Sequence, residues 1–360
     1  MNEKNPVNIF NEWDPLEEVV VGVLDGLLIP PYEPVMEGCM YDDIKPMFRN
    51  QYGGSWPKEE IAEAEKDLNE FVHILEAEGC KVVRPEILDY KRPFGNPYWQ
   101  SPCGLGAANP RDSLFVFGND IIETPMGWRS RYFECFAYRK LVKDYFSQGA
   151  GWISAPKGKL DDSMYVEDFK IPQNGEISFV LKNEEPVFDA ADMIKCGKDI
   201  FAGLSSTCNE LGIAWLQSYL DGKYGKGEIK VHTLKFNDQH PMHIDATFYP
   251  LAPGKLLVHP DRVVEIPEMF RDWDVIKAPM PCIPKSHPLY FSSIWMNINV
   301  LMLDEKRVIV EKQEENMIRI LKEHGFEVIP CRFRNFNSFG GSFHCATLDV
   351  RRKGNLQSYF

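Results

Sequence analysis

The sequence lacks the long apolar runs and the basic clusters that tie a chain to a membrane or to a nucleic acid. Its apolar runs are a handful of residues, whereas a helix that crosses a bilayer needs roughly 20. Its 40 Lys and Arg are outnumbered by 53 Asp and Glu, and the formal net charge is −13. Phosphate binding needs clustered positive charge, and the basic clusters here are short, as at Arg351-Arg352-Lys353. We therefore expect neither a membrane nor a nucleic acid as a partner.

Targeting signals and closely spaced cysteines are also missing. The first residues show no basic start, no apolar signal core and no Arg/Ser-rich amphipathic leader, which predicts a cytoplasmic protein. The nine cysteines are an odd number, none stands as C-x-x-C, and the closest pair is Cys196 and Cys208. Disulfide frameworks and zinc sites normally show tighter spacing. We expect most of the cysteines to be reduced, buried and inert.

One pattern is repeated five times along the chain: a short apolar strand, a helical or loop segment, and a closing strand. The first unit has strands at 16–22 and 81–85, and apolar residues at helical spacing predict a helix over 58–79. The strands of the other units are expected at 113–118 with 151–156, 199–204 with 228–234, 255–260 with 273–279, and 300–304, 307–310 and 326–331. Further helices are expected at 130–146, at 207–220 and around 317–324.

Five similar α/β units favour a ring with pseudo-fivefold symmetry. The alternative is an open doubly wound sheet, which the alternation of strands and helices favours by default. However, no G-x-G-x-x-G follows the first strand and no G-x-x-x-x-G-K-[ST] occurs, so the usual nucleotide-binding reason for that fold is missing. No interdomain linker is evident, because segments 86–110 and 157–183 are typical of surface loops. We predict a single domain over residues 1–360.

Cys345 is a candidate nucleophile in the stretch G-G-S-F-H-C-A-T-L-D-V. A lone cysteine is more often a buried core residue than a catalytic one. The pair Gly340-Gly341 favours the catalytic interpretation, because paired glycines let the backbone approach a ligand closely. In a strand, neighbouring side chains point to opposite faces, so His344 is not expected to serve Cys345 as a base.

The candidate base lies in H-P-M-H-I-D-A-T-F. His243 and Asp245 are two residues apart, hence on one face of a strand, where they would present an imidazole and a carboxylate to one cleft. A strand with incidental polar residues explains the same pattern equally well. A metal site is a weaker interpretation, because no second pair of His or Cys stands at ligand spacing.

Three further carboxylates stand out. In E-P-V-F-D-A-A-D, Asp192 could cap a following helix, whereas Asp189 has apolar neighbours that make a surface position hard to explain. Asp112, in N-P-R-D-S-L-F-V-F, stands at the mouth of a strand, where a simple N-terminal turn is the alternative. If these groups converge with Cys345, they form an acidic pocket around one soft nucleophile. Such a pocket suits a guanidinium group, and a thiolate beside a cationic carbon suits chemistry at that carbon.

The chain resembles the L-arginine amidinotransferases of the glycine amidinotransferase family, within the guanidino-group-modifying pentein superfamily. The resemblance runs from N-E-W-D-P-L-E-E-V-V-V-G to D-V-R-R-K-G-N-L-Q-S-Y-F. Its motifs include P-R-D, I-I-E-T-P-M-G-W-R-S-R, E-P-V-F-D-A-A-D, P-M-H-I-D-A-T-F, N-V-L-M-L-D-E-K-R-V and G-G-S-F-H-C-A-T-L-D-V-R-R. It implies a five-bladed ββαβ propeller around a central active site, L-arginine as the donor, no metal or organic cofactor, and a homodimer.

The resemblance also implies a role for each matching residue. Cys345 would carry the amidino group as a covalent thiouronium, and His243 would act as the general acid and base. Asp189 would hold the guanidinium and support His243. The remaining matches imply contacts to the donor, with Asp112 and Asp245 at its guanidinium and Arg262, Ser292 and Ser293 at its carboxylate and amino end.

The acceptor amine stays open. Met242 and Asp192 match members that use glycine, but His240 stands where those members have Asn, and a bulkier side chain there would reshape the acceptor pocket. The acceptor is either glycine or another amine in secondary-metabolite biosynthesis, such as that of a cyanotoxin or an antibiotic, and the missing mitochondrial leader favours the second. Two other functions remain: an arginine deiminase-type hydrolase that gives citrulline, and a non-catalytic protein that binds a guanidino ligand.

Overall fold

The computed structural model of the chain describes residues 5–360. Within that range the strands form five three-stranded sheets and one two-stranded hairpin. The sheets are β17 (Thr347–Arg352), β1 (Leu16–Val21) and β2 (Lys81–Val83); β5 (Leu114–Phe117), β6 (Asp120–Glu123) and β7 (Gly151–Ser154); β8 (Met193–Cys196), β9 (Asp199–Gly203) and β10 (Lys230–Leu234); β11 (Phe248–Ala252), β12 (Lys255–Val258) and β13 (Asp274–Lys277); and β14 (Leu301–Met302), β15 (Arg307–Glu311) and β16 (Glu327–Cys331). The hairpin is β3 (Phe94–Asn96) with β4 (Trp99–Ser101).

All five sheets have the same strand directions. The middle strand is antiparallel to the first strand and parallel to the third. A parallel pair needs a long crossover, and four of the five crossovers contain a helix of nine or more residues. These are α3 (Lys58–Ala77), α5 (Arg139–Ser147), α6 (Glu210–Tyr224) and α7 (Glu315–Glu323), whereas the fifth contains the 3₁₀ turn η5 (Glu268–Phe270). The open doubly wound sheet is therefore wrong, because each described sheet ends after three strands.

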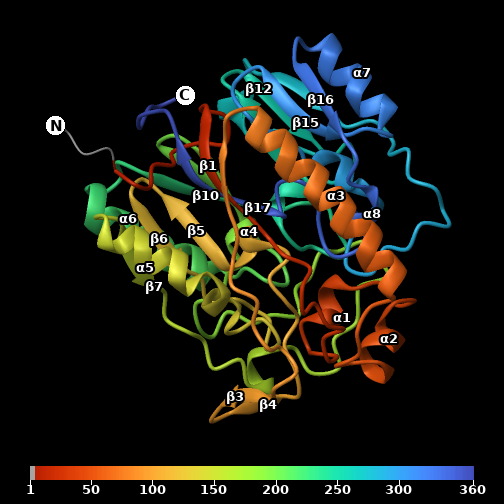
Figure 1. Cartoon of the computed structure of the whole chain (residues 1–360). Coiled ribbons are helices and arrows are strands. Elements are labelled where there is room, and N and C mark those ends of the chain that lie inside the picture. The colour runs from red at the N-terminus through yellow and green to blue at the C-terminus, as the bar shows by residue number, and fades with distance from the viewer. Residues whose placement is uncertain (1–4) are drawn as a thin grey trace.

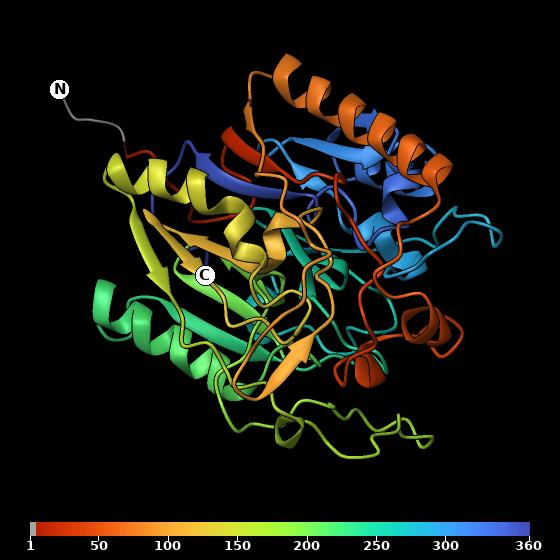
Figure 2. The ribbon, with the colours of Figure 1, turned by 60° about the horizontal axis from the view of Figure 1, so that its bottom comes forward.

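The first sheet joins the two ends of the chain. β1 pairs with β17, with Val19 opposite Asp349 and Val21 opposite Thr347. Figure 1 shows these strands, red and blue, side by side in the interior, while the four crossover helices lie on the outside. Figure 2 shows the same arrangement from a second direction. The segment that ends in Cys345 thus leads directly into β17, a buried strand.

The crossover helices form where the sequence supplies an apolar face and suitable ends. In α3, Ala64, Leu68, Phe71 and Leu75 recur every three or four residues and are buried. In α6, the side chain of Asn209 accepts a hydrogen bond from the backbone N–H of Gly212, which satisfies one free donor of the first turn. Gly225 ends this helix with φ = 104°, a conformation that glycine adopts without strain.

Several boundaries differ from the sequence prediction. The helix expected at 207–220 begins at Glu210, because Asn209 is its cap. The helix expected at 130–146 is divided into the 3₁₀ segment η1 (Glu134–Tyr138) and α5. The loop expected at 86–110 contains the β3–β4 hairpin. Shorter elements complete the fold: α1 (Met36–Cys39), α2 (Lys45–Asn50), α4 (Pro110–Ser113), α8 (Arg334–Asn337), η2 (Asp162–Met164), η3 (Ala190–Asp192), η4 (Ile244–Ala246) and η6 (Ile294–Ile298).

Three local predictions at the candidate site are wrong. Cys345 lies in a turn that precedes β17, not within a strand. His243 and Asp245 do not share a strand, because His243 caps the 3₁₀ turn η4, which contains Asp245. Asp192 caps no following helix, since it ends η3 and strand β8 follows directly. In each case a short turn at the start of a strand takes the place of the regular element, and such turns carry no periodic signal.

The described cysteines are all free thiols, and each is buried except Cys282, which is partly exposed. No helix within residues 5–360 combines the length and apolar character needed to cross a membrane.

Candidate active site

The thiol of Cys345 is held in the turn before β17 by contacts that leave little freedom. Its backbone N–H donates to Oδ1 of Asn299 at 3.1 Å, and only 4% of the residue is exposed. A Cβ atom at Gly341 would lie 2.3 Å from Cβ of Cys345, so any larger residue there would displace it. Gly340 has φ = 104°, in the region that favours glycine. Both glycines are therefore required by the turn that presents the thiol.

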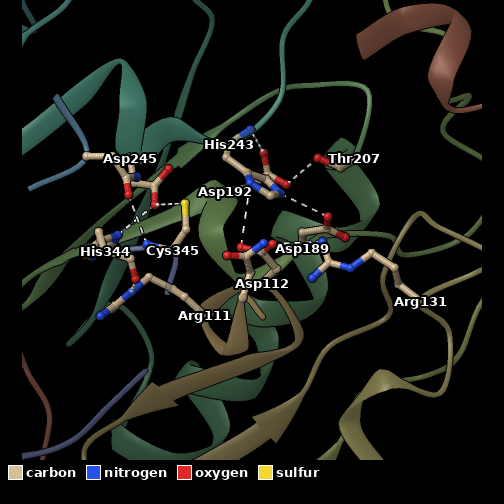
Figure 3. A network of polar contacts seen from close by, with 12 residues as sticks. Arg111, Asp112, Arg131, Asp189, Asp192, Thr207, His243, Asp245, His344 and Cys345 are labelled. Carbon is tan, nitrogen blue, oxygen red and sulfur yellow. Dashed lines mark hydrogen bonds and ion pairs between the residues drawn. The ribbon is translucent and has the colours of Figure 1, made fainter. Parts of the chain in front are cut away.

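His243 lies between carboxylates on one side of this thiol (Figure 3). Its Nε2 is 3.1 Å from Oδ2 of Asp189, and its Nδ1 is 3.7 Å from Oδ1 of Asp112. Burial favours the neutral ring, but these two carboxylates outweigh it and raise the pKa of His243 well above its ordinary value. The φ of His243 is 58°, a conformation that costs a non-glycine residue about 1–3 kcal/mol. The ring is thus held protonated, on a strained backbone.

The two carboxylates that face the ring of His243 are each fixed by donors. Oδ1 and Oδ2 of Asp189 accept from the backbone N–H of Gly127 at 3.2 Å and from Nε1 of Trp128 at 3.1 Å. Oδ2 of Asp112 accepts from Nη1 of Arg131 at 2.8 Å, while Oδ1 has no hydrogen-bond partner. Burial raises the pKa of Asp112. Oδ1 of Asp112 therefore pairs with the ring of His243 by charge, at 3.7 Å, without a hydrogen bond.

Asp192 supports the strained backbone at His243. Its Oδ1 accepts from the backbone N–H of His243 at 3.2 Å and from Oγ of Ser205 at 2.8 Å. Its Oδ2 accepts from Oγ1 of Thr207 at 2.9 Å. Burial raises the pKa of Asp192 to about 7. Asp192 therefore contacts the main chain of the site rather than its cavity.

Asp245 lies on the other side of the thiol. Its Oδ2 accepts from Sγ of Cys345 at 3.4 Å and lies 2.7 Å from Nδ1 of His344, while its Oδ1 is buried without a partner. Burial and the charge of Asp245 raise the pKa of Cys345 to about 12. Figure 3 shows the imidazole of His344 turned toward Asp245. The thiol is therefore protonated near neutral pH, and it lies between His243 on one side and Asp245 on the other.

A cavity opens over Cys345, His243 and Asp245. Its remaining walls include five of the six other predicted contact residues, all except Asp112: His240, Met242, Arg262, Ser292 and Ser293. Nε of Arg262 pairs with Oδ2 of Asp238 at 3.0 Å, and the ring of His240 packs on Tyr41 with centroids 4.4 Å apart. Asp112 and Asp189 do not line this cavity, because they lie behind His243. The structure thus brings the predicted residues together in two layers.

Sequence reasoning missed several residues that hold this site. Asn299 fixes the turn of Cys345, Arg131 fixes Asp112 and Trp128 fixes Asp189. The motif I-I-E-T-P-M-G-W-R-S-R contains Trp128 and Arg131, so their presence was signalled but their partners were not. Glu12 stands in N-E-W-D at the start of the resemblance, so its presence was also signalled, but its contact with His344 was not. Within residues 5–360 no cluster of three His, Cys, Asp or Glu side chains is arranged to hold a metal ion.

The chain is similar in sequence to two kinds of amidinotransferase, although no protein-family model matches it. It is 53% identical over 358 residues to the L-arginine:L-lysine amidinotransferase of Pseudomonas savastanoi pv. phaseolicola, which covers 99% of this chain and 97% of that protein. It is 43% identical over 366 residues to the mitochondrial glycine amidinotransferase of Xenopus tropicalis, which covers 99% of this chain and 85% of that protein.

Its three-dimensional structure is also similar to that of a solved amidinotransferase. SxtG, an amidinotransferase from Microseira wollei in the saxitoxin biosynthetic pathway, superposes with a TM-score of 0.94 at 48% sequence identity. The match covers 99% of this chain and 100% of that chain. These similarities extend over nearly the whole chain rather than over one segment of it.

Proposed function

Because the chain belongs to the L-arginine amidinotransferase family, we propose that it moves the amidino group of L-arginine to an acceptor amine and releases L-ornithine. The main support is the cavity in which the thiol of Cys345, the protonated ring of His243 and an unpartnered oxygen of Asp245 meet. A nucleophile, an acid and an anionic contact for a cation are the three parts that guanidino transfer needs.

The donor guanidinium would be held by carboxylates. Oδ1 of Asp245 is buried at the cavity without a hydrogen-bond partner, and a planar guanidinium carries the donors that such an oxygen needs. Asp112 lies behind His243, so its expected contact to the guanidinium requires the donor to reach past that ring. Asp189, fixed by Gly127 and Trp128, would keep His243 oriented and support the cation. At the far end of the donor, Arg262 would meet the carboxylate, and Ser292 and Ser293 the carboxylate and amino groups.

The first half-reaction would transfer the amidino group to the protein. The positive charge of the bound guanidinium favours the thiolate, so the thiol of Cys345 loses its proton to solvent as the donor binds. Sγ then forms a bond to the guanidino carbon. The bond from that carbon to Nε of the donor breaks, and His243 gives its proton to that nitrogen. Ornithine leaves, and the amidino group remains on Sγ as a thiouronium.

The second half-reaction would reverse these roles. The acceptor amine enters after ornithine has left, and neutral His243 takes a proton from its nitrogen. That nitrogen bonds to the amidino carbon, and the carbon–sulfur bond breaks to return the thiolate of Cys345. Because one product leaves before the second substrate binds, we expect ping-pong kinetics.

The acceptor would be an amine other than glycine. His240 lines the cavity and packs on Tyr41, so it occupies space near the entrance that a small Asn would leave open. The relatives include an enzyme named for lysine and another from a toxin pathway, in addition to the enzyme named for glycine. We therefore favour a larger amine in secondary-metabolite biosynthesis, with Met242 as a further wall of the acceptor site.

Membership of this family also leads us to expect a particular fold, location and oligomeric state. We infer that the five sheets are the blades of a ββαβ propeller closed by the pairing of β17 with β1, and that residues 1–360 form one domain around a central site. We also expect a cytoplasmic homodimer. Sedimentation of the purified protein tests the dimer: a single species of monomer mass at micromolar concentration would contradict it.

The decisive experiment is an incubation with L-arginine labelled at its guanidino carbon, with glycine, lysine and other amines offered separately. Mass spectrometry follows ornithine, citrulline and each new guanidino product, and Cys345→Ala is the inactive control. We expect ornithine and a labelled guanidino product with an amine other than glycine. Labelled guanidinoacetate at equal efficiency would contradict the acceptor, and citrulline without any acceptor would contradict the transferase.

A further inference from the structure

His344 is a fully buried histidine beside Cys345 that the proposed chemistry does not use. Each of its ring nitrogens faces a carboxylate: Nδ1 lies 2.7 Å from Oδ2 of Asp245, and Nε2 lies 3.2 Å from Oε2 of Glu12. An imidazole donates to both only when both nitrogens carry hydrogen. A histidine that merely filled space would need neither contact.

Glu12 fixes the far end of this arrangement. It is completely buried, and its Oε1 accepts from Nζ of Lys195 at 2.8 Å, while its Oε2 lies 3.5 Å from Nη1 of Arg111. Burial acts to raise the pKa of Glu12, but Lys195, His344 and Arg111 together hold it well below its ordinary value. The carboxylate that faces Nε2 of His344 is therefore a fixed anion.

The other surroundings of His344 leave its ring one position. Its carbonyl oxygen accepts from Nε of Arg111 at 2.7 Å, and its ring packs on Tyr249 with centroids 4.9 Å apart. Asp349, which pairs with Arg111 at 2.7 Å, is the remaining nearby charge. The imidazole therefore contacts the N-terminal segment, η4 and β11, while α4 fixes the main chain of His344.

The contact with His344 determines which oxygen of Asp245 remains without a partner. Its Oδ2 is occupied by His344 and Cys345, which turns Oδ1 away from both, and Oδ1 is the oxygen without a partner. Burial acts to raise the pKa of Asp245, but the hydrogen bond and charge of His344 bring it below its ordinary value. Asp245 thus stays ionised beside the thiol, with one oxygen free.

We propose that His344 is a positioning residue for the donor, which acts through the buried chain Glu12–His344–Asp245 to aim Oδ1 of Asp245 at the guanidinium of arginine. The proposal rests on the proposed function for the identity of the donor. It assigns His344 no contact with substrate and no proton transfer.

Two neutral variants, each of which keeps one of the two nitrogen positions of the ring, test this role. In His344→Asn the amide nitrogen replaces Nδ1 and retains the contact with Asp245, whereas in His344→Gln it replaces Nε2 and retains the contact with Glu12. A hydrogen bond to a charged group contributes about 1.5–3 kcal/mol, so we expect KM for arginine to be about tenfold or more higher in His344→Gln than in His344→Asn. Equal KM values for arginine in the two variants would overturn the proposal.

A second measurement needs no turnover. Without a donor from residue 344, the pKa of Asp245 loses its largest lowering contribution and rises, while His243 and Asn299 still lower it. A less ionised Asp245 raises the pKa of Cys345 less. More thiolate then forms at a given pH, so iodoacetamide should alkylate Cys345 severalfold faster at pH 8 in His344→Gln than in His344→Asn. Identical rates in both variants would count against the proposal.

Controls separate this role from stability and from the proposed function. His232, which lies 2.7 Å from Asp199 away from the site, gives the matched variant His232→Asn, in which KM for arginine and the alkylation rate should not change.

If His344→Gln does not fold, Glu12→Gln removes the anchor instead, and an unchanged KM for arginine there would overturn the proposal. If the wild-type protein makes no guanidino product from arginine, the proposed function fails, whereas normal turnover with indistinguishable His344 variants refutes this role alone.

Discussion

At the scale of single residues, the site is defined by where its protons are. The thiol of Cys345 is protonated, because burial and Asp245 raise its pKa to about 12. The ring of His243 is also protonated, because Asp112 and Asp189 raise its pKa against the effect of burial. The free protein therefore holds an acid ready for the leaving group, while its nucleophile stays unreactive until a cation arrives.

The pH dependence of alkylation tests this state of Cys345. Thiolate is the reactive form, so with a pKa of about 12 we expect the rate with iodoacetamide to rise about tenfold per pH unit between roughly pH 7 and 10. Peptide mass spectrometry measures the rate at Cys345, and Cys282, which is partly exposed, serves as an internal reference. A rate that levels off below pH 8 would mean that the thiol is already ionised.

Substitution of His240 tests the acceptor wall. His240→Asn removes the ring that packs on Tyr41 and widens the cavity on that side. We expect glycine to become a better acceptor, with kcat/KM for glycine about tenfold higher, because the pocket no longer demands a larger amine. The burst of ornithine in the first half-reaction should not change, and a slower burst would show that His240 acts on the donor instead.

At the scale of elements, the turn before β17 decides whether the thiol is presented. Gly341→Ala would bring a Cβ within 2.3 Å of Cys345, so the turn must shift. A misplacement of about 1 Å lowers catalysis on the order of a hundredfold, and we expect a loss of at least that size in kcat/KM. Steady-state assays measure it on protein that is shown to be folded.

The matched control lies in helix α6. A Cβ at Gly222 would meet nothing within 4 Å, and alanine favours a helix interior by about 1 kcal/mol over glycine. Gly222→Ala should therefore keep full activity and raise the free energy of unfolding slightly. Equal activity in the two variants would contradict the requirement for glycine at residue 341.

At the scale of the whole molecule, Arg352 ties the sheet that contains both ends of the chain to a second sheet. Its guanidinium is fully buried and donates to Asp349 at 2.7 Å, to the carbonyl of Asp14 at 2.6 Å and to the carbonyl of Met302 at 2.8 Å. These partners belong to β17, to the segment before β1 and to β14. One side chain near the C-terminus therefore links the β17–β1–β2 sheet to the sheet that contains β14.

Replacement of this arginine should weaken the whole fold. Arg352→Gln leaves the buried carboxylate of Asp349 with less compensation, and breaking a buried ion pair costs about 3–5 kcal/mol. Denaturant unfolding measures the loss. Arg319→Gln, which removes an exposed pair with Glu323 in α7, should change the free energy of unfolding by less than about 0.5 kcal/mol. Similar losses in both variants would mean that the burial of Arg352 adds nothing to the free energy of unfolding.

The sequence by itself determined the repeated units and the helix over α3, because periodicity is a local property, and residue type suggested the groups that we propose for the chemistry. It also predicted that His344 is not the base of Cys345. The physical reason is different in the structure, where Asp245 and Glu12 engage the ring of His344 and no strand turns it away from the thiol. Only the tertiary structure decided that Asp112 and Asp189 lie behind His243, and that one oxygen of Asp245 has no partner. These facts depend on contacts between residues far apart in the chain, such as Glu12 with His344, and no local pattern records such contacts.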